Sequence, residues 1–119
     1  MSTDGSHIQT GKQGEDAAAA YITSLGYNLI IRNWRYRRCE VDAIASKGKV
    51  LHFFEVKTRS SNYILPEESV SSKKLRKLKE AAEAYLYQYP EWKMIQFNIL
   101  SIIIRPDAAI DFFLIEDVF

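Results

Sequence analysis

Two apolar runs separated by only three residues constrain the fold of this chain more than any other feature of its sequence. The first run, EVDAIAS, spans residues 40–46, and the second, VLHFFEVKT, spans residues 50–58, with KGK between them. Two such runs around a short glycine-containing turn are the usual signal for a β-hairpin. The second run is apolar enough to be a central strand, yet it carries an acid and a base.

The remaining sequence predicts helices and strands in the order α-β-β-β-α-β-β. Apolar side chains recur at helical spacing over residues 11–27 and 71–89. Further strands are expected over residues 27–34, 93–104 and 111–118, and a loop over residues 61–71. The sequence therefore predicts an α/β fold with a mixed central β-sheet flanked by helices.

Length and composition exclude several classes of protein. A chain of 119 residues is the size of one domain, and no run reaches the eighteen or so apolar residues of a membrane helix. Cys39 is the only cysteine, which excludes a disulfide framework and a cysteine-based metal site. The N-terminal stretch lacks the pattern of a secretory signal, so we expect a cytoplasmic protein. We expect residues 1–10 to be a flexible tail and residues 11–119 to form a single domain.

Positive charge is concentrated in the middle of the chain. Residues 29–79 contain thirteen Lys/Arg and five Asp/Glu, a balance of +8, whereas residues 80–119 have a balance of −5. A basic block of this kind is typical of a phosphate-binding surface, although a mixed surface without function can produce it too.

The predicted hairpin brings acidic residues together. Because side chains alternate along a strand, Glu40 and Asp42 should share a face, as should Glu55 and Lys57. A two-residue turn at 47–48 would pair Glu40 with Glu55 and place Asp42 diagonal to Glu55, about 7–8 Å away. Like charges at this spacing destabilise a sheet unless a cation lies between them.

Magnesium fits such a pair, because it takes one or two carboxylates plus water. We expect Asp42 and Glu55 to bind Mg²⁺, or Mn²⁺, with the main-chain carbonyl of Val56 as a further oxygen. Lys57 would then orient or deprotonate an attacking water, or stabilise charge on a phosphate. This division of roles is that of metal-assisted phosphodiester hydrolysis without an organic cofactor. The alternative is a solvated strand, because an acid and a lysine two residues apart are common.

The first helix contributes one more acid. Glu15 falls on the same helical face as Ala18, Ile22 and Leu25, so we expect it to continue a buried stripe towards the sheet. Gly11 and Gly14 lie near this face and would allow close approach of the backbone. Glu15 either joins the sheet carboxylates or merely complements the positive end of the helix dipole.

Two basic clusters are candidates for binding nucleic acid. The segment RNWRYRR interleaves arginine with Trp34 and Tyr36, a composition suited to phosphates and stacked bases. Cations at the start of the second helix oppose its dipole and repel one another, which an anionic partner would offset. The candidate residues are Arg32, Arg35, Arg37, Arg38, Arg59, Lys73, Lys74, Arg76 and Lys77.

Five sequence blocks together resemble the YraN-type family of uncharacterised bacterial proteins. They are GKQGEDAAAAYI, LGYNLIIRNWR, CEVDAIA, FFEVKTR and PEESVSSKKLRKL. That family resembles the PD-(D/E)xK nucleases, especially archaeal Holliday-junction resolvases, which implies a restriction-endonuclease-like core. By this resemblance Asp42, Glu55 and Lys57 match the catalytic signature, Glu15 the helix acid, and Glu40 an acid beside the metal site. This chain has Cys39 where the family usually has glycine. Cys39 either narrows a close approach of DNA or backbone there or is a small, tolerated replacement.

Three functions remain open from the sequence. The first is a magnesium-dependent endodeoxyribonuclease, with branched or damaged DNA as the candidate substrate and a homodimer implied by the resolvase analogy. The second is a non-catalytic nucleic-acid-binding module of the same fold. The third is a protein-interaction role in which the carboxylates form internal ion pairs, and it predicts no salt-sensitive affinity for nucleic acid.

Overall fold

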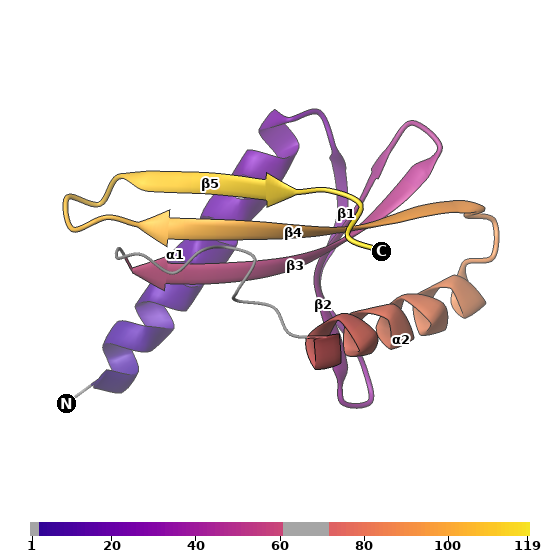
Figure 1. The fold of residues 1–119 in the computed structure, drawn as a ribbon, viewed down its shortest axis with the longest axis horizontal. Helices are drawn as coiled ribbons and strands as arrows, with labels where there is room; N and C mark the ends of the chain where they lie inside the picture. The colour runs from indigo at the N-terminus through magenta and orange to yellow at the C-terminus, as the bar shows by residue number, and fades with distance from the viewer. Residues whose placement is uncertain (1–2, 61–71) are drawn as a thin grey trace.

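The computed structural model describes residues 3–60 and 72–119, with the backbone alone described for residues 3–11 (Figure 1). The loop expected over residues 61–71 lies outside the described residues. The described part contains two helices and five strands in the expected order. They are α1 (Thr3–Ser24), β1 (Asn28–Tyr36), β2 (Cys39–Lys47), β3 (Val50–Ser60), α2 (Ser72–Gln88), β4 (Met94–Ile104) and β5 (Ile110–Ile115).

The five strands form one mixed sheet with the order β1-β2-β3-β4-β5. β3 and β4 run parallel, and the other neighbouring pairs are antiparallel. Parallel neighbours need a long crossover between them, and α2 lies in this connection. The expected α/β fold with a mixed sheet flanked by helices is confirmed, and it is compatible with a restriction-endonuclease-like core.

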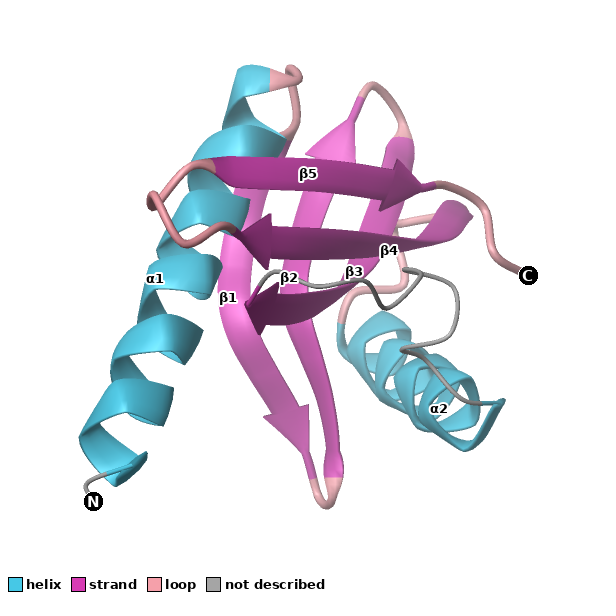
Figure 2. Ribbon diagram, turned by 60° about the vertical axis from the view of Figure 1, so that its left-hand side comes forward, coloured by secondary structure: helices cyan, strands magenta, loops and turns pink. Residues whose placement is uncertain are grey.

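The two helices cover opposite faces of the sheet (Figure 2). On one face, α1 packs Ala18 and Ile22 against Phe54 and the inner residues of β4. On the other face, α2 packs Leu78 and Tyr85 against β2 and β3. The chain therefore has two small hydrophobic cores, one between each helix and the sheet.

Helix α1 begins earlier and is rotated relative to the sequence prediction. It starts at Thr3, so residues 3–10, which the sequence assigns to a tail, are helical. Its buried line runs through Gly14, Ala18 and Ile22, whereas Glu15 and Leu25 are exposed. The expectation that Glu15 continues the buried stripe is therefore wrong. The buried residues are spaced four apart and start at Gly14, so Glu15 falls beside this line and faces solvent.

The register of the β2–β3 hairpin differs by two from the predicted one. Lys47 pairs with Val50 and Ala43 with Phe54, so the turn residues are Gly48 and Lys49. Gly48 has a φ of 62°, a conformation that favours glycine at the first turn position. In this register the rung after Ala43 and Phe54 brings Asp42 beside Glu55, and the predicted pairing of Glu40 with Glu55 is wrong.

The side chains of β2 do not keep a simple alternation at Asp42. Val41 belongs to the core under α2, whereas Ala43, two residues on, belongs to the core under α1. Two residues of the same parity would share a face in a regular strand. The strand therefore changes face at Asp42.

The neighbouring strand changes face at the same level. Arg32 of β1 bonds Asp16 on α1, whereas Trp34 packs edge-on against Tyr85 of α2. Asn33 between them has a φ of 53°, which is rare for a residue other than glycine. The β1–β2 ribbon is thus irregular at the level from which Asp42 projects.

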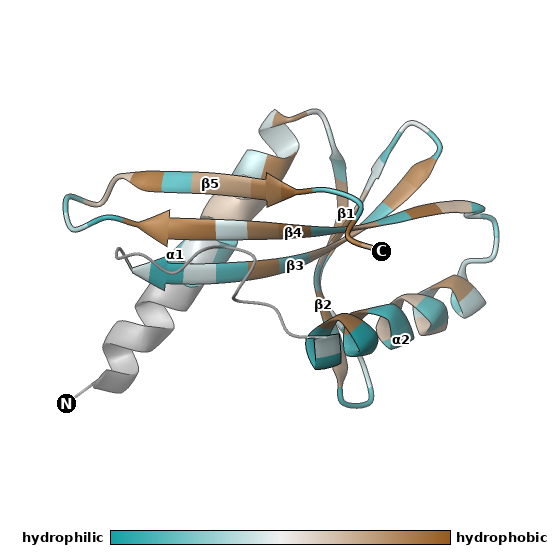
Figure 3. Cartoon of the chain, in the orientation of Figure 1, coloured by the Kyte–Doolittle hydropathy of each residue, from teal (hydrophilic) through white to brown (hydrophobic). Residues whose placement is uncertain are grey.

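Hydropathy follows this architecture. Apolar residues are concentrated along β4 and β5, and polar residues at the first turns of α2 and at the β1–β2 turn (Figure 3).

Within residues 3–60 and 72–119, neither helix has the length and apolar character needed to cross a membrane.

Candidate metal-assisted hydrolytic site

Acidic and basic side chains converge in a cavity of about 290 Å³ on the α2 side of the β2–β3 pair. Strands β2 and β3 supply its acids, and α2 and the β1–β2 turn supply its cations. The residues around it are Arg38, Glu40, Asp42, Glu55, Val56, Lys74 and Lys77. We call this cavity the acid pocket.

Asp42 is fixed by the main chain of the neighbouring strand. Its Oδ2 accepts a 2.7 Å hydrogen bond from the N–H of Val56. Burial and the adjacent charge of Glu55 raise the pKa of Asp42 to about 7, although the Val56 hydrogen bond works in the opposite direction. Two carboxylates thus share a partly buried space and repel each other there.

Glu55 is paired with a lysine that the sequence assigns only to phosphate binding. Nζ of Lys74 on α2 lies 3.1 Å from Oε2 of Glu55. The Glu55 side chain is 12% exposed and the Lys74 side chain 47% exposed. The pair therefore joins a buried acid to a cation that still faces solvent.

Lys57 lies beside this pair. Burial, followed by a hydrogen bond with Lys74 and the charge of Lys74, lowers the pKa of Lys57 to about 8. Burial acts to lower the pKa of Lys74. The hydrogen bond with Lys57 and the carboxylate of Glu55 outweigh burial, so the pKa of Lys74 is raised. Of the two amines, Lys57 is therefore more often neutral near neutral pH, and only a neutral amine can accept a proton.

The two other predicted acids lie at the edge of this arrangement. Glu40 borders the acid pocket and forms a 3.4 Å ion pair with Arg35. Glu15 is exposed and borders a separate, much smaller cavity together with Asp42 and Arg32. Arg32 itself bonds Asp16 of α1 at 2.9 Å. Glu15 and Arg32 thus approach Asp42 from the α1 side of the sheet.

The donor set suits a hard, partly hydrated cation. Among the residues the structure describes, no three His, Cys, Asp or Glu side chains form a group that could hold a metal. Asp42 and Glu55 offer two carboxylates in a space large enough for water, which matches magnesium better than a metal held only by protein ligands. Burial and, after it, repulsion from Glu55 raise the pKa of Asp42, and a bound cation would remove this penalty on the charged form. These residues fit a Mg²⁺ or Mn²⁺ site.

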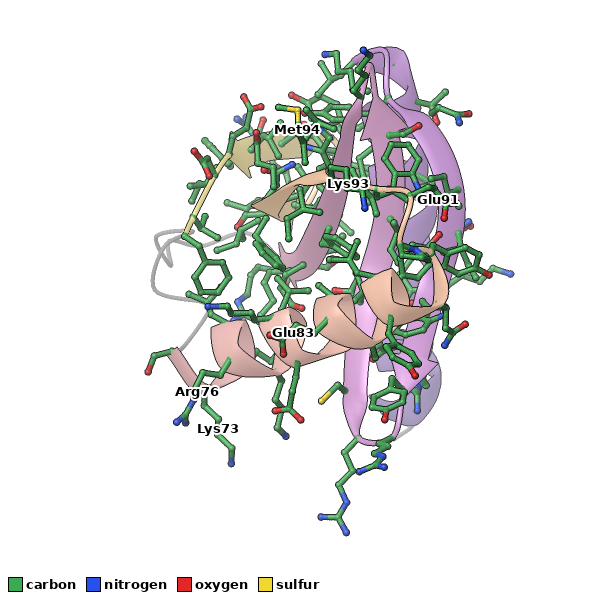
Figure 4. All side chains as sticks on the ribbon, turned by 90° about the vertical axis from the view of Figure 1, so that its right-hand side faces the viewer. Lys73, Arg76, Glu83, Glu91, Lys93 and Met94 are labelled. Atoms are coloured by element: carbon green, nitrogen blue, oxygen red, sulfur yellow. The ribbon has the colours of Figure 1, made fainter. Side chains whose placement is uncertain are left out.

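Apart from Arg32 and Arg35, which pair with Asp16 and Glu40, the predicted basic residues separate into three groups. Arg38, Lys74 and Lys77 border the acid pocket. Lys73 and Arg76 extend from the first turns of α2 into solvent, whereas Lys93 follows the C-terminal end of this helix (Figure 4).

The third group lies away from the pocket wall. Arg37 is exposed at the β1–β2 turn, with its guanidinium 5.3 Å from the centre of the Tyr36 ring. Arg59 on β3 is half-buried, and its Nε has no hydrogen-bond partner within the described part of the chain. Its charge is near enough to Lys57 to contribute to the lowered pKa of that amine.

Cys39 packs in the core next to Glu80 of α2. Its buried thiol lies in the core under α2, with Sγ 3.8 Å from Oε1 of Glu80. The family resemblance left open whether Cys39 narrows an approach to the site or is a small, tolerated replacement. Within the described residues, this side chain does not border the acid pocket.

Comparison with known proteins identifies the family. A model of the uncharacterised protein family UPF0102 matches residues 14–102. The chain belongs to the UPF0102 family. This confirms the YraN-type resemblance inferred from the five sequence blocks.

Curated UPF0102 proteins resemble this chain over most of their length. The Cytophaga hutchinsonii protein is 42% identical over 97 residues, covering 81% of this chain and 86% of the relative. The Dictyoglomus turgidum protein is 38% identical over 104 residues, covering 86% of this chain and 88% of the relative. The Parabacteroides distasonis protein is 39% identical over 94 residues, covering 78% of each. The UPF0102 match includes all the described residues that border the acid pocket.

Proposed function

We propose that this UPF0102 protein is a magnesium-dependent endodeoxyribonuclease that hydrolyses phosphodiester bonds, with branched or damaged DNA as its candidate substrate. The observation that supports this most strongly is the convergence of Asp42 and Glu55 in one pocket next to Lys57. A protein that only binds DNA gains nothing from placing two acids beside a phosphate.

Each residue has a definite role in this proposal. Asp42 and Glu55 would hold the divalent ion, which supplies Lewis-acid activation of water and neutralises phosphate charge when bound. The Val56 N–H fixes the direction of the Asp42 carboxylate, so the ligand is oriented before the ion arrives. Lys57, with its lowered pKa, takes up the proton of the attacking water.

Cations on both sides of the pocket would orient the DNA backbone. Arg38 comes from the β1–β2 turn and Lys77 from α2, so phosphates entering the pocket would be contacted from two directions. Without these cations, the carboxylates of the pocket would repel the negatively charged DNA backbone. The surrounding positive charge offsets that repulsion and brings the scissile phosphate to the acids.

Cleavage assays test the proposal directly. The wild-type protein is incubated with supercoiled, linear, single-stranded and four-way-junction DNA in Mg²⁺ or Mn²⁺, beside Asp42→Asn and Lys57→Met. We expect metal-dependent cleavage by the wild type and a loss of at least about 100-fold in both variants. Cleavage that persists in either variant would point to a contaminant or to another site.

A second candidate is a non-catalytic nucleic-acid-binding module, favoured by the cations around the pocket. Salt-sensitive DNA binding without cleavage in any metal would support this module over the nuclease.

A further inference from the structure

Lys74 occupies the side of the acid pocket where a cation is needed most. Glu55 is nearly buried, and a buried carboxylate without a compensating charge is costly. Among the described residues, Glu55 forms its ion pair with Lys74. It does not form one with Lys57, which lies two positions along the same strand. The compensating charge therefore comes from another element, α2.

The attachment of Lys74 allows its ammonium group to move. Its side chain is about half exposed and stands in the first turns of α2, whereas Glu55 is held within the central strand β3. A lysine stem is long and flexible, and its ammonium is a point charge without a fixed geometry. The ammonium can leave Glu55 without any change in the backbone.

A divalent ion and this ammonium compete for the same carboxylate. Two cations within a few ångströms of one another repel strongly in a partly buried site. An ion bound between Asp42 and Glu55 would therefore push the Lys74 ammonium away from Glu55. Arg38 and Lys77 border the pocket and are exposed, so they mark the side where a phosphate would meet the displaced ammonium.

We infer that Lys74 is an exchangeable internal counter-ion, which neutralises Glu55 in the metal-free protein and contacts phosphate once a divalent ion displaces it. The inference rests on the proposed function, because it takes the acid pocket as the metal site. It assigns Lys74 two successive partners, a carboxylate and then a phosphate.

Two effects of opposite sign follow for a Lys74→Met variant. Metal binding becomes tighter, because the internal competitor is gone. A competing ion pair of this exposure corresponds to an improvement of about threefold to tenfold in the metal dissociation constant. Binding of DNA in the presence of metal becomes weaker, because one phosphate contact is lost.

The experiment uses the full chain without DNA and measures Mn²⁺ affinity by electron paramagnetic resonance of the free ion. Lys73→Met is the matched control, because it removes the same charge from the adjacent position of α2 where the side chain faces solvent (Figure 4). We expect Lys74→Met to bind Mn²⁺ more tightly than Lys73→Met, and Lys73→Met to resemble the wild type. DNA affinity is then measured in Ca²⁺ by fluorescence anisotropy, and we expect it to fall in Lys74→Met.

Metal affinity in Lys74→Met that equals or falls below that of Lys73→Met would overturn the inference, as would a wild type that binds no Mn²⁺. If Lys74→Met does not fold, Lys74→Gln provides the same comparison. Mn²⁺ binding that tightens in Lys74→Met while the wild type cleaves no DNA would support the counter-ion role and refute the nuclease proposal. The two ideas can therefore fail separately.

Discussion

The carboxylate of Asp42 on β2 accepts its 2.7 Å hydrogen bond from the main-chain N–H of Val56 on β3, where regular pairing of the two strands ends. The last ladder pair is Ala43 with Phe54. A side chain thus replaces a main-chain acceptor at the next rung. This one contact orients Asp42 and keeps it beside Glu55.

Replacing Asp42 separates the role of its hydrogen bond from the role of its charge. Asp42→Asn retains an oxygen that accepts the Val56 N–H and removes the repulsion with Glu55, so the metal-free protein should be at least as stable as the wild type. Asp42→Ala leaves that N–H unsatisfied and should lower the free energy of unfolding by about 1–3 kcal/mol. Urea denaturation in EDTA measures the free energy of unfolding of both variants. An asparagine variant less stable than the alanine variant would show that the hydrogen bond from Val56 does not stabilise the fold.

Gly14 should not tolerate a side chain. A Cβ at this position would overlap the side chain of Thr58 on β3, so α1 or Thr58 would have to shift. We expect Gly14→Ala to lower the free energy of unfolding by about 1–3 kcal/mol, despite the roughly 1 kcal/mol that alanine gains in helix propensity. Thr58→Ala should recover part of this loss in a double-mutant cycle. Thermal or chemical denaturation of the four proteins is the measurement, and a stabilised Gly14→Ala would show that the helix does not pack this closely.

His52 should make stability depend on pH. It is buried at the sheet, and Nδ2 of Asn98 donates a 3.0 Å hydrogen bond to its Nδ1 when the ring is neutral. Burial lowers its pKa, the charge of Lys47 acts in the same direction, and the charge of Glu116 opposes both. The unfolded chain therefore takes up a proton below about pH 6.5 that the folded protein resists, and the free energy of unfolding falls as pH drops through that value.

The control for this effect is His52→Gln, which keeps an acceptor for Asn98 but does not titrate. Unfolding free energies of both proteins are measured from pH 8 to pH 5. The wild type should lose stability relative to the variant over this range. A constant difference would mean that the histidine is protonated equally in both states.

Cations beside the acid pocket should contribute measurably to DNA affinity. Arg38→Met and Lys77→Met should each reduce the slope of log affinity against log salt by about one. Lys93→Met removes the same charge from the segment between α2 and β4, at a different cavity, and should leave the slope unchanged. Fluorescence anisotropy at several salt concentrations gives the slopes, and equal slopes for all three variants would place the DNA surface elsewhere.

The sequence predicted the elements of the fold because they depend on local patterns. Helical spacing identified the buried face of α2, including Leu78 and Tyr85, and alternating apolar runs identified the strands. The composition of β3 also indicated that Glu55 and Lys57 belong to a buried strand rather than to a loop. These properties follow from side-chain chemistry over a few neighbouring residues.

The tertiary structure alone decided how the acids meet. The register depends on which residues form the turn, and the left-handed conformation of Gly48 shifts it by two. The change of face at Asp42 accompanies the irregular Asn33 on another strand. Lys74 reaches Glu55 from a helix 19 residues further along the chain. The register is set by the conformation of a local turn, whereas the change of face and the Lys74 contact depend on distant segments, which no local pattern of residues records.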